Sequence, residues 1–176
     1  TACGACAQRC PRSCISMEEN EYGFLYPRVD AAQCVGCGIC DKVCHLNSAS
    51  AGAETKEAFA CVHRSEKTVK GSTSGGAFSA IAERIFALGG VVYGCGYLTP
   101  TEPHHIRIEA PEDIDRLRGS KYVQSTMGDS YKQVLEDLCA GKWVLFTGTP
   151  CQVAGLKAFL GRPYETLVTA DIICHG

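Results

Sequence analysis

A run of four closely spaced cysteines constrains this chain more than any other feature. Residues 34–44 carry the spacing C-x2-C-x2-C-x3-C, which is typical of bacterial ferredoxins. Three thiolates separated by two residues can wrap one cubic iron–sulfur cluster, while the fourth turns away toward a second cluster. The spacing therefore predicts a 4Fe–4S site.

A copy of this run lies at the amino end. Its cysteines lie 34 positions before those of residues 34–44, so that Cys3, Cys6 and Cys10 match Cys37, Cys40 and Cys44. The same offset puts the partner of Cys34 at position 0, so we expect the first ligand to have been cut off. The chain also stops at residues 171–176, where a polar loop should open. We therefore expect a fragment truncated at both ends.

In two-cluster ferredoxins, the fourth cysteine of each run binds the cluster of the other run. We expect one cluster to be held by Cys10, Cys34, Cys37 and Cys40. The other would take Cys3, Cys6, Cys44 and the missing residue. Cys14 is extra, and it is either a substitute ligand or a small buried residue on a helix after Pro11. Residues 23–30 suggest a hairpin strand whose aromatic side chains cover the clusters.

Composition excludes several classes of protein. Thirteen cysteines could form a secreted disulfide framework, but the number is odd and the cysteines cluster at ligand spacing. Structural zinc remains an alternative, although three cysteines in successive x2 steps fit its usual paired knuckles poorly. A net charge of −2 predicts no nucleic-acid partner, and no apolar stretch is long enough for a membrane span. So many thiolates favour a reducing cytoplasm.

The sequence divides into three parts. Residues 1–48 are expected to form an α+β ferredoxin-like two-cluster domain, and residues 49–57 a linker that few contacts cross. Residues 58–176 predict the amino-terminal part of an α/β domain, incomplete at its carboxyl end. The apolar run 143–146, a helix to residue 160 and a strand over 167–173 make a βαβ unit, so the sheet is at least partly parallel.

Further elements are expected in the second domain. They are strands over 59–62, 91–97 and 105–108, a short helix at 111–117, and a helix over 77–88 with Phe78, Ile81, Ile85 and Leu88 on one face. The glycines of residues 94–96 suggest that something approaches the backbone closely. His104 and His105 face opposite ways on a strand, which favours surface or core roles over one shared metal.

Three segments could carry chemistry. Residues 71–76 precede a helix, where free backbone N–H groups suit a phosphate, although a plain N-cap explains them equally well. Residues 118–125 form a dense polar loop. Cys151 falls between a strand and a helix start, where α/β sheets bind ligands and a thiolate is favoured, although an inert buried thiol is also possible.

With these segments in place, the chain resembles the family of beta subunits of coenzyme F-420 hydrogenases and dehydrogenases. The resemblance covers essentially the whole chain and rests on the double cysteine run and on residues 74–76, 119–125, 148–152 and 174–176. It implies an FAD-dependent oxidoreductase with its flavin in the second domain. The residues expected around the flavin or substrate are Ser74, Gly75, Gly76, Lys121, Tyr122, Gln124, Thr149, Cys151 and Gln152.

A flavin fits beside iron–sulfur clusters because it can exchange one electron or two. We therefore expect electrons to pass between a redox carrier or partner subunit, the two clusters and FAD, and on to a deazaflavin coenzyme or another organic acceptor. Lys121 would meet a phosphate or developing negative charge, and Cys151 and Cys174 would touch the flavin or hold further metal. No catalytic residue is identified, and the fragment is expected to bind neither cofactor fully. An electron-transfer subunit without flavin and a zinc-stapled interaction module are the alternatives.

Overall fold

The computed structural model describes residues 2–47 and 55–173. The helices are α1 (Ala5–Arg9), α2 (Ile39–Val43), α3 (Glu66–Lys70), α4 (Ala77–Ala87), the 3-10 helix η1 (Pro111–Arg116), α5 (Ser130–Cys139) and α6 (Pro150–Leu160). The strands are β1 (Ile15–Glu19), β2 (Leu25–Val29), β3 (Val91–Thr99), β4 (Glu102–Ile108), β5 (Val144–Gly148) and β6 (Leu167–Asp171). Among the described residues, no helix has the length and apolar character needed to cross a bilayer.

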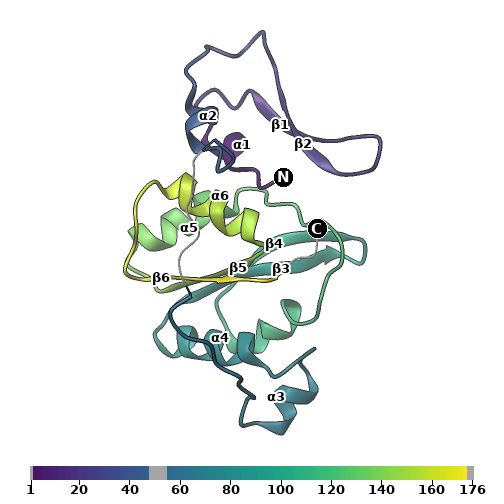
Figure 1. Cartoon of the computed structure of the whole chain (residues 1–176), viewed down its shortest axis with the longest axis vertical. Helices are drawn as coiled ribbons and strands as arrows, with labels where there is room; N and C mark the ends of the chain where they lie inside the picture. Colours follow the sequence, from purple (N-terminus) through teal and green to yellow (C-terminus); the bar gives the residue numbers. More distant parts are fainter. Residues whose placement is uncertain (1, 48–54, 174–176) are drawn as a thin grey trace.

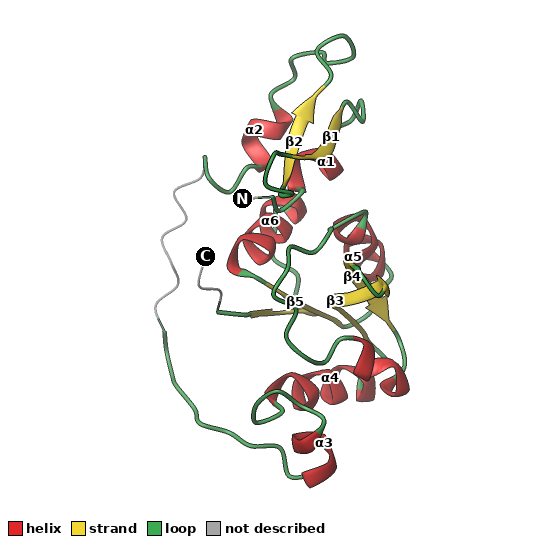
Figure 2. Cartoon of the chain, turned by 90° about the vertical axis from the view of Figure 1, so that its right-hand side faces the viewer, coloured by secondary structure: helices red, strands yellow, loops and turns green. Residues whose placement is uncertain are grey.

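A four-stranded sheet in the order β4-β3-β5-β6 forms the centre of the molecule. Strands β3, β5 and β6 run parallel, and β4 pairs antiparallel with β3. Figure 1 shows α5 and α6 on one face of the sheet and α4 on the other. The region of α1, α2 and the β1–β2 hairpin stacks on the layer of α5 and α6, as Figure 2 also shows. The predicted partly parallel sheet and its βαβ unit are confirmed.

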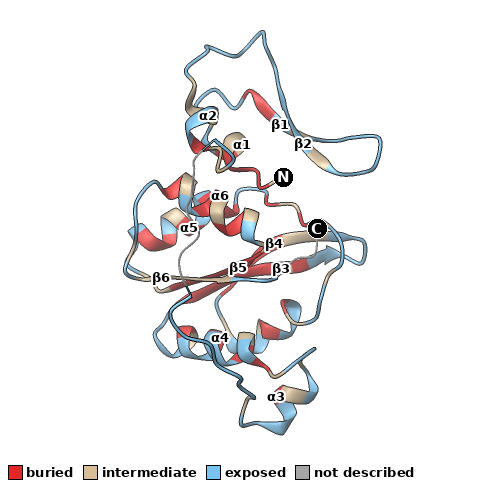
Figure 3. Cartoon of the chain, in the orientation of Figure 1, coloured by how far each residue is buried: buried red, intermediate tan, exposed pale blue. Residues whose placement is uncertain are grey.

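Both faces of the sheet are buried, which explains its apolar strands. Because side chains alternate along a strand, Val144 and Phe146 of β5 pack under α5 and α6, while Leu145 packs under α4. Figure 3 shows the buried residues concentrated along the central strands and the inner faces of the helices, whereas the hairpin is largely exposed. Fully burying one such side chain contributes about 1.5–3 kcal/mol.

Local signals at both ends of α6 match its observed bounds. Thr149 is the N-cap in a capping box with Gln152, and Pro150 occupies the first turn, where its missing N–H costs nothing. Gly161 ends the helix at φ 69°, in the left-handed region that glycine adopts without strain. The chain therefore enters and leaves this helix where the sequence predicts.

The amino-terminal region shares a core with the sheet layer. Cys3, Ala5 and Val43 are buried in the same cluster as Tyr131 and Phe159 of α5 and α6. The expectation that few contacts cross between the two parts is therefore wrong. Much of the linker expected at residues 49–57 lies outside the described residues, and residues 55–57 have no regular secondary structure.

Three local expectations differ from the structure. No helix follows Pro11, because Ser13 adopts φ 50° and the chain turns into β1. Residues 59–62 form no strand, since they pair with no edge of the sheet and leave Phe59 81 % exposed. The buried face of α4 consists of Ser79, Ala82 and Ile85, and it is rotated away from the expected Ile81 and Leu88.

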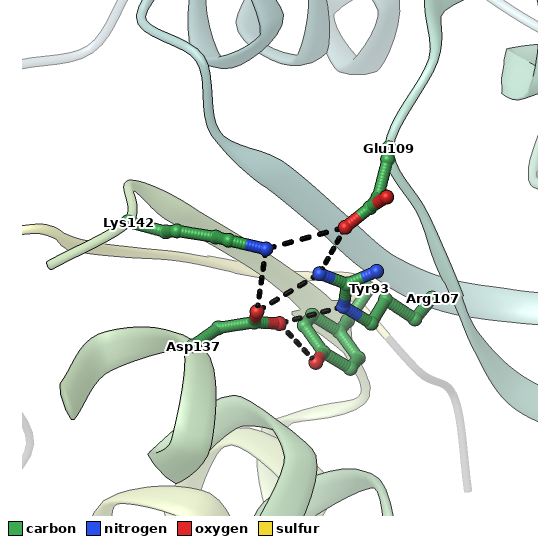
Figure 4. Close-up of polar contacts among 5 residues, drawn as sticks. All are labelled: Tyr93, Arg107, Glu109, Asp137 and Lys142. Atoms are coloured by element: carbon green, nitrogen blue, oxygen red, sulfur yellow. Dashed lines mark hydrogen bonds and ion pairs between the residues drawn. The ribbon is translucent and has the colours of Figure 1, made fainter. Parts of the chain in front are cut away.

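A network of charged groups ties α5 to the sheet (Figure 4). Arg107 of β4 donates two hydrogen bonds to the Asp137 carboxylate, at 2.6 and 2.9 Å, and the Tyr93 hydroxyl donates a third at 2.6 Å. Lys142 and Glu109 complete the network at its exposed side. Burial alone would raise the pKa of Asp137, but the hydrogen bonds from Arg107, Tyr93 and Lys142 outweigh burial and lower this pKa to about 2.

The Asp137→Asn substitution should destabilise the chain by about 2–3 kcal/mol at neutral pH, because it leaves Arg107 and Lys142 without their shared carboxylate. Urea unfolding at pH 7 measures this loss. The matched Glu109→Gln substitution removes an exposed partner of the same cations and should cost no more than about 1 kcal/mol. Equal losses of stability in the two variants would show that the buried Asp137 carboxylate contributes no more than the exposed Glu109 carboxylate.

Candidate cluster and cofactor sites

The 34-residue repeat in the sequence is also a repeat in the backbone. Helices α1 and α2 both begin at a left-handed glycine, Gly4 at φ 72° and Gly38 at φ 69°, and both end at an extended cysteine, Cys10 or Cys44. The hydrogen bonds also correspond, since the Cys10 N–H donates to Ala7 as the Cys44 N–H donates to Asp41. Two short helices with the same caps therefore present their cysteines in the same way.

The first group of thiols consists of Cys3, Cys6 and Cys44. Burial is the main reason that the pKa of Cys3 and of Cys6 is raised, and both also interact electrostatically with Cys44. Cys3 interacts in addition with Cys151 at the start of α6. The pairing of Cys44 with the first run follows the crossed ligand arrangement expected from the sequence. Cys3 of this group lies at the junction with the sheet layer, in the same buried cluster as Tyr131 and Phe159.

The second group lies around Cys10. The Cys10 Sγ is 3.4 Å from the Cys14 Sγ, and Cys14 also interacts with Cys34. Backbone N–H groups of Cys14 and Arg12 donate to the Cys10 sulfur and lower its pKa. The hydrogen bond with Cys10, together with burial, raises the pKa of Cys14 to about 11. These backbone donors favour the thiolate form of Cys10, and the Cys14 side chain is buried.

Among the other cysteines expected to bind the same cluster as Cys10, Cys34 and Cys37 are exposed to water and Cys40 is half-buried. No three His, Cys, Asp or Glu side chains within residues 2–47 and 55–173 converge closely enough for one metal ion.

Gln8 joins the cluster region to the sheet layer. Its Oε1 accepts hydrogen bonds from the Tyr131 and Lys132 backbone N–H groups, at 2.9 and 3.4 Å, and so caps the start of α5. Its Nε2 is buried beside Gly4 and has no hydrogen-bond partner among the described residues. A buried donor beside Gly4, the residue after Cys3, is consistent with a nearby sulfur acceptor, because cluster sulfurs accept hydrogen bonds.

At the start of α6, Thr149 and Gln152, two residues expected to contact the flavin, form hydrogen bonds within the protein. Gln152 accepts from the Thr149 N–H and donates to the Ser125 hydroxyl, both at 2.9 Å. His105 Nδ1 lies 2.9 Å from Ser125 Oγ, and its Nε2 lies 3.1 Å from the Thr147 carbonyl oxygen. Burial lowers the pKa of His105 to about 4, so the ring is neutral and donates through Nε2. His105 has the core role that its position predicts.

Cys151 lies in the first turn of α6, with its Sγ 3.1 Å from Thr149 Oγ1. Ser125 and His105, which complete the hydrogen-bonded group at this helix start, come from other elements, and no local pattern indicates that they would meet Gln152. The only feature of the sequence that points to this hydrogen-bonded group is the polar character of residues 118–125. Cys174 lies outside the described residues.

The polar loop 118–125 is mostly occupied by protein contacts. Lys121 donates to the Leu117 and Arg118 carbonyl oxygens, at 3.0 and 2.8 Å, and burial lowers its pKa. The Gln124 side chain accepts from the Leu25 N–H of β2 at 2.8 Å. Tyr122 is 93 % exposed. Lys121 lies near Cys95, in the middle of β3.

The loop before α4 is covered by another part of the chain. A Cβ added at Gly75 would lie 2.5 Å from the Cys61 carbonyl oxygen, and the Gly75 carbonyl accepts from the His63 N–H at 2.7 Å. Gly76 is the N-cap of α4 at φ 82°, and Ser74 is exposed. The glycines of β3 likewise make room for side chains, since a Cβ at Gly94 would lie 2.7 Å from Thr147 Oγ1. The described residues therefore form no complete cradle for FAD.

Comparisons with known proteins support the cluster assignment. A family model described as a 4Fe–4S dicluster domain matches residues 1–48. The chain is 26 % identical over 177 residues to a subunit of the F(420)H(2) dehydrogenase of Methanosarcina mazei, a match that covers 95 % of this chain and 50 % of that protein. A stretch of 47 residues, 27 % of this chain and 17 % of the relative, is 40 % identical to the DNA-directed RNA polymerase subunit Rpo3 of Methanosarcina acetivorans.

The predicted ferredoxin-like start and the resemblance to a dehydrogenase subunit are thus confirmed. The chain begins with a region that matches a 4Fe–4S dicluster domain, is similar over nearly its whole length to this subunit of F(420)H(2) dehydrogenase, and spans about half the length of that relative.

The stability of the chain should depend on pH through His105. Its pKa is about 4 in the folded chain and about 6.5 in the unfolded chain, so only the unfolded chain gains a proton between these values. This contribution is complete above pH 6.5 and is lost as the pH falls toward 4, by about 3 kcal/mol in all. Urea unfolding of wild type and His105→Gln across this range measures the difference. Parallel pH profiles would contradict the assignment.

The iron content should distinguish Cys10 from Cys14. Cys10→Ser is expected to remove about four irons and a matching amount of sulfide, because it breaks one ligand set. Cys14→Ser should leave the iron content unchanged, and the exposed Cys139→Ser serves as the control. Iron and sulfide are measured on anaerobically prepared protein. Loss of iron from Cys14→Ser with retention in Cys10→Ser would make Cys14 the ligand.

Proposed function

We propose that this chain passes electrons one at a time between an external carrier and a flavin held by the α/β part, through two 4Fe–4S clusters. Cys10, Cys34, Cys37 and Cys40 would hold one cluster, and Cys3, Cys6, Cys44 and one further ligand the other. The clusters supply one-electron transfer, and a flavin would couple it to a two-electron reaction. The similarity to a subunit of F(420)H(2) dehydrogenase supports a deazaflavin coenzyme or another organic molecule as acceptor, within a dehydrogenase complex in a reducing cytoplasm.

The contact between Cys3 and α6 is the observation that carries this proposal. A Cβ added at Gly155 would lie 2.9 Å from the Cys3 Sγ and 3.0 Å from the Tyr131 hydroxyl oxygen. Cys151, one turn earlier on α6, interacts with Cys3 and lies at the carboxyl edge of the sheet. The buried cysteine group thus abuts the α/β part, while Cys34 and Cys37 of the other group face water. Electrons would arrive at the exposed group and leave at the buried one.

An electron-transfer subunit without its own flavin is the second candidate. The Cys61 carbonyl covers Gly75, and the polar side chains of Gln124 and Gln152 already have protein partners. Lys121 is likewise bound to backbone carbonyls. These contacts favour a platform that relays electrons without binding FAD.

Metal and flavin analysis of the full-length protein, prepared without oxygen, separates these functions. The proposal predicts about eight irons and eight sulfides with one flavin per chain, and a visible spectrum that bleaches on reduction. The same iron content without flavin would support the second candidate. Zinc in place of iron and sulfide would overturn both.

A further inference from the structure

An open groove runs between the cluster region and the helical layer over the sheet. It encloses about 760 Å³ and is lined by residues of α1, α2, α5 and α6. Its apolar lining consists of the half-buried Ile39 and Leu135 over the buried Val43 and Phe159. Cys10 also lines this groove, which places it beside the more exposed group of thiols.

The charge of this groove is opposite to that of the chain. Its lining contains three cations, Arg9, Lys42 and Lys132, and one carboxylate, Glu136, whereas the whole chain has a net charge of −2. Arg9 lies with its guanidinium carbon 5.4 Å from the centre of the Phe159 ring, which fixes one cation over the apolar surface. Lys42 and Lys132 are exposed on opposite sides of the groove, on α2 and α5.

The two lysines differ in their surroundings. Lys132 pairs with Asp129 at 2.8 Å, an exposed contact that water and salt weaken. No carboxylate of the described residues forms an ion pair with Lys42. An apolar surface with a cationic rim complements a partner that has a small apolar patch surrounded by carboxylates.

We propose that this groove, defined by Arg9, Lys42, Lys132, Leu135 and Phe159, docks the acidic face of an electron-carrier protein. The inference rests on the proposed function and names the surface where the carrier binds. One electron leaves the reduced carrier, which is thereby oxidised, and reduces the cluster held by Cys10 and its partners. No bond forms, and no proton or leaving group is transferred. Opposite charges steer the encounter, and the apolar surface holds the complex.

Stopped-flow reduction of the full-length, cluster-loaded protein tests this surface. The probe is a reduced flavodoxin of low isoelectric point, a one-electron carrier whose flavin spectrum differs from that of the clusters, and the change in its flavin absorbance gives the second-order rate constant. The wild-type rate should fall steeply as salt rises from about 0.02 to 0.3 M. The Lys42→Glu and Lys132→Glu double variant should lower the low-salt rate at least about tenfold and flatten its salt dependence. Lys42→Gln with Lys132→Gln should lie between the two.

The control carries a charge reversal elsewhere. Lys67 lies on α3, on the other side of the sheet from the groove (Figure 1). The Lys67→Glu substitution should therefore change the rate by less than about twofold. Equal slowing by Lys67→Glu, or unchanged rates in the groove variants, would overturn the docking surface. Reduction by dithionite should be the same in every variant. Should dithionite fail to bleach the wild type, the proposed function falls, and the docking surface with it.

Discussion

Close contact between Cys3, just before α1, and α6 holds the two halves of this chain together, and it depends on the absence of a side chain at position 155. Cys3 occupies the space that a Cβ at Gly155 would need, and Ala5 and Val43 complete the same buried surface. Gln8 adds a polar link by capping α5. A cysteine proposed as a cluster ligand thus also belongs to the hydrophobic core. If Cys3 binds a cluster, the packing of this region and the position of that ligand depend on each other.

Patterns that involve neighbouring residues are predictable from the sequence. The spacing of the cysteines, the continuous apolar run of β5 and the glycine that ends α6 each act within a few residues, so their outcomes follow from local chemistry. The repeat is also visible, because the same caps at Gly4 and Gly38 need the same residues. Cys44 lies near Cys3 and Cys6, while the crossed ligand arrangement that the two runs indicate stays a prediction.

Contacts between distant segments are not predictable in this way. The polar loop around Gln124 suits a ligand, yet this side chain binds the backbone of Leu25, 99 positions away, and Gln8 reaches Tyr131 across 123 positions. The partners in such contacts are set by how whole layers stack, and no local pattern records that. For the same reason, the sequence around Gly75 is compatible with an open phosphate site, whereas the coil at Cys61 covers it.

The two helices of the repeat are alike in backbone, but the sheet layer covers only one side of the pair. Cys3 is buried against α6, whereas Cys34 and Cys37 remain in contact with water. Dissolved oxygen would therefore reach the outer cluster first. On the proposed function, oxidative damage would begin at the cluster beside the proposed docking groove. It would stop electrons from entering, while the inner cluster and its contact with the sheet stayed intact.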